Sequence, residues 1–320
     1  TAIYQGAKVV YDFLFEVEGK SELNGVTSKI TLPFEGTSSE YIVEDQDAVE
    51  IFFIDEGALP YIDVITFINL IDGAIESDLF VFTPEGTDRL RIDYTVEYED
   101  FAGAMQAESF WAVIDFTANT FTVSSFDFFD NYVAETESDY GEGLNYIDAT
   151  YVEGKSVTIP LGYYSFDILM HQVDEKTYYL MPLHVTNLLF AGNIYYDVYY
   201  NGDMLFGVDT FTISGPDVEE KALLDRIRTS SFNDLDAPAD IRWGTYNFLA
   251  LAIDYFYGLR DMYEIESYYE LIAQHASDMV NGTDVFLYTK VFNIANEMDD
   301  LHTSHAFTGY YEKPFEIALY

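Results

Sequence analysis

The chain has 320 residues, with 57 acidic against 14 basic side chains, and its formal net charge is −43. Hydrophobic residues make up 49% and aromatic residues 18%, so there is material for a packed core and a disordered acidic tail is excluded. The negative charge argues against nucleic acid and anionic membrane surfaces as partners. No apolar run approaches the roughly 20 residues of a membrane span, and the absence of Cys removes disulfides and thiolate metal sites.

The acidity itself has several interpretations. A solvated, repulsive surface is the simplest, and a high-salt habitat or weak binding of Ca²⁺ at many sites would give the same composition. No Asp-x-Asp-x-Asp-Gly loop occurs, so an EF-hand is not expected. The sequence begins at Thr1 without a charged and then apolar leader. We therefore expect a mature protein of the cell envelope or the extracellular space, a lipoprotein if an anchoring Cys has been removed.

Residues 1–215 show the period-2 alternation of apolar and polar side chains that indicates β-strands. Strands are predicted over 29–32, 48–53, 90–98 and 110–116. Ala118-Asn119 predicts a hairpin turn between residues 115 and 123. Asn201-Gly202-Asp203 predicts another, since Asn and Gly adopt positive φ at low cost.

Two segments of this β-rich part resemble each other. In residues 59–71 and again in 180–190, a Pro near the end of an extended run precedes a short helical apolar pattern. Two related α+β modules would explain the likeness, and chance similarity of apolar segments is the alternative. The acidic stretch 127–143 is interpreted as a loop or linker between them. We therefore predict a first β-rich module over 1–140 and a second over 141–215.

After Ser214-Gly215-Pro216 the apolar period changes from 2 to 3.6, which indicates helices. Helices are predicted over 219–228, 243–259, 264–280 and 284–301. The last of these carries a single apolar stripe, formed by Leu287, Val291, Ile294, Met298 and Leu301. Residues 216–320 are therefore predicted to form a small helical bundle, and the chain is assigned to the α+β class.

The segment with the clearest chemistry follows that stripe. Residues 297–307 contain His302 and His305, two of the five histidines, where the last predicted helix ends. A His in this position can project into a cleft and act as general base for a serine hydroxyl, with Asp299 or Asp300 orienting it. The alternative is that both histidines simply finish a helix, where a cation near the C-terminal dipole is favourable.

A helical region that ends in Asp-Asp-Leu-His-Thr-Ser-His, residues 299–305, resembles the N-terminal region of the S41 family of serine peptidases. That family includes the tail-specific, or C-terminal processing, peptidases and the tricorn core. The resemblance covers roughly residues 216–310 and includes Trp243 and the run 253–259. It implies proteolysis of a peptide or protein substrate without a cofactor. The base would be His302 if the pattern is Asp-x-His-Thr, and His305 if the pattern is Thr-Ser-His.

The two β-rich modules are similar to copper amine oxidase N-terminal-like domains, a likeness that implies no copper. The remaining histidines, His171, His184 and His275, are interpreted as packing residues. His302 and His305 are three positions apart and lack the His-Glu-x-x-His arrangement of zinc peptidases, so no metal site is expected.

The chain departs from the S41 pattern in one respect. In that family the serine nucleophile and its partner Lys or Glu lie downstream of this motif, on a core with a Gly-rich oxyanion turn. No Gly-x-Ser-x-Gly elbow occurs in the 320 residues, and Ser304 by itself is a poor nucleophile. We therefore expect an N-terminal region that recognises substrate and gives the base histidine to a catalytic domain absent from this chain, which is inactive alone. The alternatives are a non-enzymatic cell-surface binding or adhesion protein and a Ca²⁺-dependent structural module.

Overall fold

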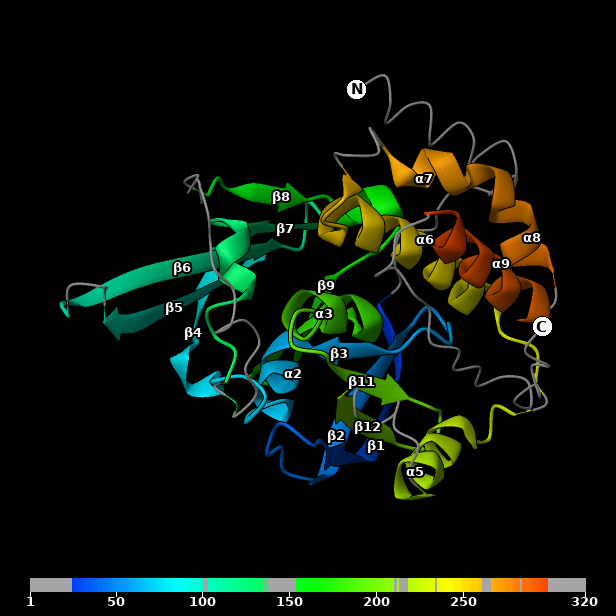
Figure 1. The fold of residues 1–320 in the computed structure, drawn as a ribbon, viewed down its shortest axis with the longest axis horizontal. Coiled ribbons are helices and arrows are strands. Elements are labelled where there is room, and N and C mark those ends of the chain that lie inside the picture. Colours follow the sequence, from blue (N-terminus) through cyan, green and yellow to red (C-terminus); the bar gives the residue numbers. More distant parts are fainter. Residues whose placement is uncertain are drawn as a thin grey trace.

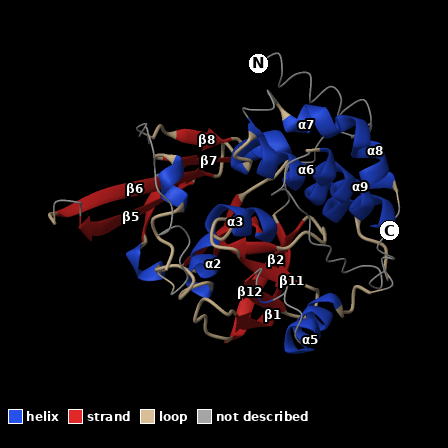
Figure 2. Ribbon diagram, in the orientation of Figure 1, coloured by secondary structure: helices blue, strands red, loops and turns tan. Residues whose placement is uncertain are grey.

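A computed structural model gives the fold. It describes residues 25–99, 103–134, 136, 154–209, 212, 218–233, 235–260, 266–282 and 284–298. Two β-sheets and several helices make up this part of the chain (Figure 1, Figure 2), so the predicted α+β class is confirmed.

The larger sheet has seven strands, all antiparallel to their neighbours except β1, which runs parallel to β12. In spatial order the strands are β11 (Tyr196–Tyr200), β12 (Leu205–Asp209), β1 (Val26–Thr37), β2 (Gln46–Ile54), β3 (Tyr61–Asp63), β10 (Lys176–Pro182) and β9 (Leu169–Val173). Strands from both predicted β-rich modules thus share one sheet, and the division into sheets does not follow the predicted boundary at residue 140.

The smaller sheet is an antiparallel meander of five strands. These are β4 (Val81–Glu85), β5 (Arg89–Glu99), β6 (Met105–Asp115), β7 (Thr120–Val123) and β8 (Val157–Ile159). In β5 the buried Leu90, Ile92 and Tyr94 alternate with more exposed residues, as the period-2 pattern predicts. The predicted hairpin between β6 and β7 is confirmed, with Asn119 at φ 52° in the turn.

Both segments of the internal repeat fold as a strand followed by a short helix. β3 leads into α2 (Val64–Leu70), and β10 leads into α3 (Leu183–Phe190). The two strands are direct neighbours in the larger sheet, with Ile62 opposite Met181. The likeness of residues 59–71 to residues 180–190 is therefore structural, and the two copies lie side by side.

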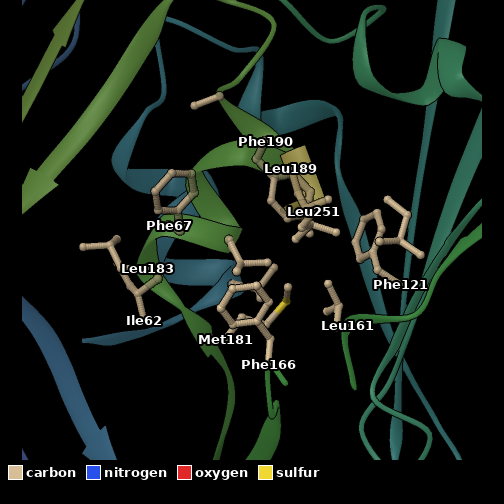
Figure 3. Close-up of a cluster of buried hydrophobic side chains, with 14 of the residues drawn as sticks. Ile62, Phe67, Phe121, Leu161, Phe166, Met181, Leu183, Leu189, Phe190 and Leu251 are labelled. Carbon is tan, nitrogen blue, oxygen red and sulfur yellow. The ribbon is translucent and has the colours of Figure 1, made fainter. Parts of the chain in front are cut away.

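The largest hydrophobic core cluster joins the two sheets to most of the helices. It includes Ile62 and Met181 of the larger sheet, Phe121 of the smaller sheet, Phe190 of α3 and Leu251 of a later helix (Figure 3). The Phe121 and Phe190 rings meet edge to face with centroids 5.8 Å apart. Helix α3 consequently lies where the two sheets and the helical region meet.

The helical region is built from α6 (Ala239–Phe256), α7 (Tyr268–Leu271), α8 (Ala276–Asn281) and α9 (Asp284–Glu297). Helix α5 (Val218–Arg228) lies apart from them (Figure 1) and packs Leu223 and Ile227 on β12 of the larger sheet, so the bundle predicted over 216–320 does not include it. The helices predicted over 219–228, 243–259 and 284–301 correspond to α5, α6 and α9. The continuous helix predicted over 264–280 is wrong, because α7 and α8 are separated by the 3₁₀ helix η5 (Ile272–His275). Among the described residues, no helix combines the length and the apolar character that crossing a membrane requires.

Short 3₁₀ helices also occur in the β-rich part: η1 (Ser77–Leu79), η2 (Phe126–Phe129) and η3 (Leu161–Tyr164). η2 overlaps the start of the stretch 127–143, which the sequence pattern predicts as a loop or linker. Phe128, Phe129 and Tyr132 of that stretch are buried in the core, so its described beginning is part of the packed fold.

Candidate functional site

The sequence-predicted site residues His302, Ser304 and His305 lie outside the described residues, which end at Met298. The structure does describe the helix that leads into this motif. The predicted apolar stripe of α9 is confirmed through its described length, since Leu287, Val291, Ile294 and Met298 are all buried.

Helix α9 is held against α8, and α8 in turn contacts α6. Lys290 of α9 forms an ion pair with Asp278 of α8, with Nζ and Oδ2 3.1 Å apart. The Asp278 side chain is 56% exposed, so solvent screens this pair and the buried stripe supplies most of the attachment. The motif therefore follows a helix whose position is set by packing.

The C-terminal end of α6 is anchored to the β-rich part through a buried carboxylate. Asp254 is 4% exposed and accepts a hydrogen bond from the Tyr164 hydroxyl at 2.7 Å and another from the backbone N–H of Tyr268 at 2.7 Å. Burial, followed by the Asp254 charge, raises the pKa of Tyr164, so this hydroxyl stays protonated and continues to donate. The carboxylate of Asp254 on α6 thereby links this helix to η3 and to α7.

The N-terminal end of α6 is anchored by a second carboxylate. Asp240 Oδ2 accepts from the backbone N–H of Ala58 at 2.6 Å and of Leu59 at 2.9 Å, in the connection between β2 and β3. Charge-assisted bonds of this kind are stronger than neutral ones and fix an orientation. Helix α6 is thus held at both ends, and the packing of α8 on α6 and of α9 on α8 fixes the positions of those two helices.

The middle of α6 packs on α3 around His184. The imidazole lies edge-on to Phe166 and to Phe248, each ring centroid 5.2 Å away. Its Nε2 is buried and has no hydrogen-bond partner among the described residues. Burial lowers the pKa of His184 from 6.5 to about 4, so the ring is neutral at pH 7. The interpretation of His184 as a packing residue is consistent with this position, but sequence gave no sign of its unpaired nitrogen.

The other described histidines have no comparable setting. His171 lies on β9 beside the rings of Phe52 and Tyr178, and His275 lies in η5. Within the described ranges, no group of three or more His, Asp or Glu side chains is arranged to hold a metal ion.

The buried role of Asp254 on α6 is predictable from the sequence. Asn247, Ala250, Leu251 and Asp254 follow the spacing of a buried helix face, and all four are buried. An acid at the end of such a face indicates a buried hydrogen-bonding role, because an unpaired charge there would be strongly unfavourable.

Comparison of the chain with protein-family models, with curated proteins and with solved structures finds no match. The assignment of function therefore depends on the residues themselves.

Proposed function

We propose that this chain is the N-terminal region of an exported S41-like serine peptidase. In this proposal the β-rich part recognises a peptide or protein substrate, and the helical region delivers a base histidine, His305 or His302, to a serine on a catalytic core that the 320 residues do not include. The observation that carries the proposal is the course of α9, a helix packed by a buried stripe that runs directly into Asp-Asp-Leu-His-Thr-Ser-His.

The chemistry requires a positioned base. A serine hydroxyl is a weak nucleophile until a neighbouring group accepts its proton, and an imidazole with a pKa near neutrality does so efficiently at pH 7. Such proton transfer works only when donor and acceptor lie within hydrogen-bond reach. A histidine that follows an anchored helix is suited to this role, because the two anchors of α6 and the packing of α9 restrict where the motif begins.

The test uses the longer natural protein that includes a catalytic core. His302→Ala and His305→Ala variants are compared with His275→Ala, whose histidine lies in η5, earlier in the sequence than the motif. We expect one motif variant to lower kcat for peptide hydrolysis by about 10²–10⁴-fold, the usual contribution of a general base, while His275→Ala leaves kcat unchanged. Unchanged turnover in both motif variants would refute the proposal.

A second candidate is a non-enzymatic binding protein of the cell surface, and a specific feature of the smaller sheet favours it. On β5 the residues paired with β4 are Arg89–Asp93, and on β6 the residues paired with β7 are Ala112–Asp115. Beyond these contacts β5 and β6 continue as a two-stranded ribbon that projects from the molecule (Figure 1). Tyr98 is 48% exposed and Met105 is 66% exposed on this ribbon. An exposed ribbon of this kind suits the binding of an extended peptide.

The charge of the ribbon defines the test of this second candidate. Glu97, Glu99 and Glu108 are exposed there, so a Lys-rich extended peptide is the appropriate probe. Replacing Glu97 and Glu108 by Gln should weaken its binding by about 2–10-fold, as expected for exposed ion pairs. Asp174→Asn combined with Glu175→Gln removes the same two charges from the exposed β9–β10 turn and should not weaken it. Equal effects of both changes would show that the peptide senses only overall charge.

A further inference from the structure

His184 occupies the contact between α3 and α6. It lies in the first turn of α3, and Gly244 of α6 comes close to it: a Cβ added at Gly244 would lie 3.9 Å from the ring atoms Cε1 and Nε2, and 3.2 Å from Leu59. Phe166 and Phe248 complete an apolar wall around the ring. The absence of a side chain at position 244 therefore lets α6 approach the imidazole closely.

This environment accepts a neutral imidazole and opposes a charged one. The ring nitrogen Nε2 is buried and has no hydrogen-bond partner among the described residues. An unprotonated nitrogen without a partner is a moderate defect, but protonation would bury a positive charge and a new N–H donor for which no described residue supplies an acceptor. The docked arrangement of α3 and α6 thus depends on the protonation state of one side chain.

The surrounding charges do not compensate that proton. α3 contains no other titratable residue. The titratable and charged groups on α6 are Asp240, Arg242, Tyr246, Asp254 and Tyr255. Those on the neighbouring segments are Asp63 at the start of α2, Asp55 and Glu56 in the β2–β3 connection, and Tyr164 and Asp167 on either side of Phe166. Burial alone accounts for the lowered pKa of His184, and none of these groups contributes to it. Asp240 and Asp254 already accept hydrogen bonds from other residues.

The direction of the pH effect follows from linkage. His184 binds its proton more weakly when α6 is docked than when the ring is exposed, so docking is fully stable above the ordinary pKa of 6.5. Stability is then lost as the pH falls from 6.5 towards about 4, the pKa in the docked state.

We propose that His184 makes the contact between the β-rich part and the helical region sensitive to acid, in that protonation at its buried Nε2 weakens the docking of α6 on α3. Because α8 and α9 are attached to α6, the whole helical region is held less firmly when the ring ionises. The proposal is independent of the peptidase hypothesis. If that hypothesis also holds, acid would displace the base histidine from the serine that it activates.

The test measures opening directly and needs no activity. Amide hydrogen exchange of α6, corrected for intrinsic exchange rates, gives an opening constant at each pH. With pKa values of 6.5 in the open state and about 4 in the docked state, this constant should rise about 20-fold between pH 7 and pH 5. In His184→Phe, which keeps an aromatic ring and cannot ionise, the rise attributable to this residue should disappear. The control His275→Gln should keep the wild-type response.

A second variant and two further measurements test the same proposal. If His184→Phe does not fold, His184→Leu serves the same purpose, and NMR titration of the His184 ring in the unaltered chain requires no variant. Amides of β5 and β6 report whether the effect is confined to the α3–α6 contact. Equal pH responses in the wild type and the variant, ionisation of the ring near pH 6.5 while α6 stays protected, or an equal loss of protection in β5 and β6 would each overturn the proposal.

Discussion

The hydrogen bond between Tyr164 and Asp254 should be a measurable energetic link between the β-rich part and the helical region. Both side chains are almost fully buried, at 2% and 4% exposed, and the hydroxyl and carboxylate oxygens are 2.7 Å apart. A hydrogen bond to a charged group contributes about 1.5–3 kcal/mol, and a buried site gives little screening to reduce it. Tyr164→Phe removes the donor without changing the ring, and Asp254→Asn removes the charge with little change in shape.

A double-mutant cycle isolates this interaction. The free energy of unfolding is measured by chemical denaturation for the wild type, both single variants and the double variant, and we expect a coupling energy of about 1.5–3 kcal/mol. Tyr94→Phe is the matched control, because the Tyr94 hydroxyl is buried and donates to the carbonyl of Phe128, so its effect should add to that of Asp254→Asn. A coupling energy for the Tyr164 pair below about 0.5 kcal/mol would refute the view that this contact fixes α6.

Two further substitutions test other parts of the fold. The Asn201 amide donates hydrogen bonds to carbonyl groups at the end of α5, and its oxygen accepts from backbone N–H groups of the β11–β12 turn. Asn201→Asp removes the donor and should lower the free energy of unfolding by about 2–4 kcal/mol. The loss should be smaller in acid, because a protonated carboxyl group can donate again. The exposed Asn281→Asp, also before a glycine, should cost under about 1 kcal/mol, and equal losses would exclude a special role for Asn201. Gly73 has φ 91° and a Cβ there would lie 1.9 Å from the carbonyl oxygen of Ile42, so Gly73→Ala should destabilise by about 2–4 kcal/mol in thermal or chemical unfolding. A Cβ at Gly258 would meet no atom within 4 Å, so Gly258→Ala should change the free energy of unfolding by less than about 0.5 kcal/mol. A similar loss of stability at both glycines would contradict the steric argument.

The secondary structure was predictable where a local signal is strong. Alternating residues in β5, the Asn119 turn and the apolar stripe of α9 each express a period or a turn preference within a short window. The third predicted helix failed for a physical reason. Ile272, Ala276, Met279 and Val280 keep helical spacing and are buried, while the backbone between α7 and α8 tightens into 3₁₀ geometry. Side-chain periodicity does not distinguish these two hydrogen-bonding patterns over so few residues.

Strand pairing was not predictable in the same way. The repeat indicated two related units but not that β3 and β10 would be neighbours, and nothing local marks β1 as the partner of β12. Such pairings are decided by the packing of the whole core, which a short window does not contain. The aromatic residues of the predicted linker were missed because irregular segments have no period, although Phe128 and Phe129 are fully apolar.

The candidate site likewise has features that the sequence predicts and features that it does not. The motif around His302 and His305 is recognisable only as a sequence, since it lies outside the described residues. The contacts that hold the preceding helices, at Asp240, Asp254 and His184, emerge only when distant segments meet. A sequence motif indicates which residues have catalytic side chains, whereas the residues that contact them are known only from the three-dimensional structure.

The parallel pairing of β1 with β12 has a consequence for biosynthesis. Phe34 lies opposite Leu205, so the larger sheet cannot be completed until β12 has followed β1 out of the ribosome. Contacts between residues so far apart close slowly, because a long loop must first be restricted. Until then β1 and β2 form a hairpin with an unsatisfied edge, and the strong mutual repulsion of acidic nascent chains would help to keep such intermediates from joining one another.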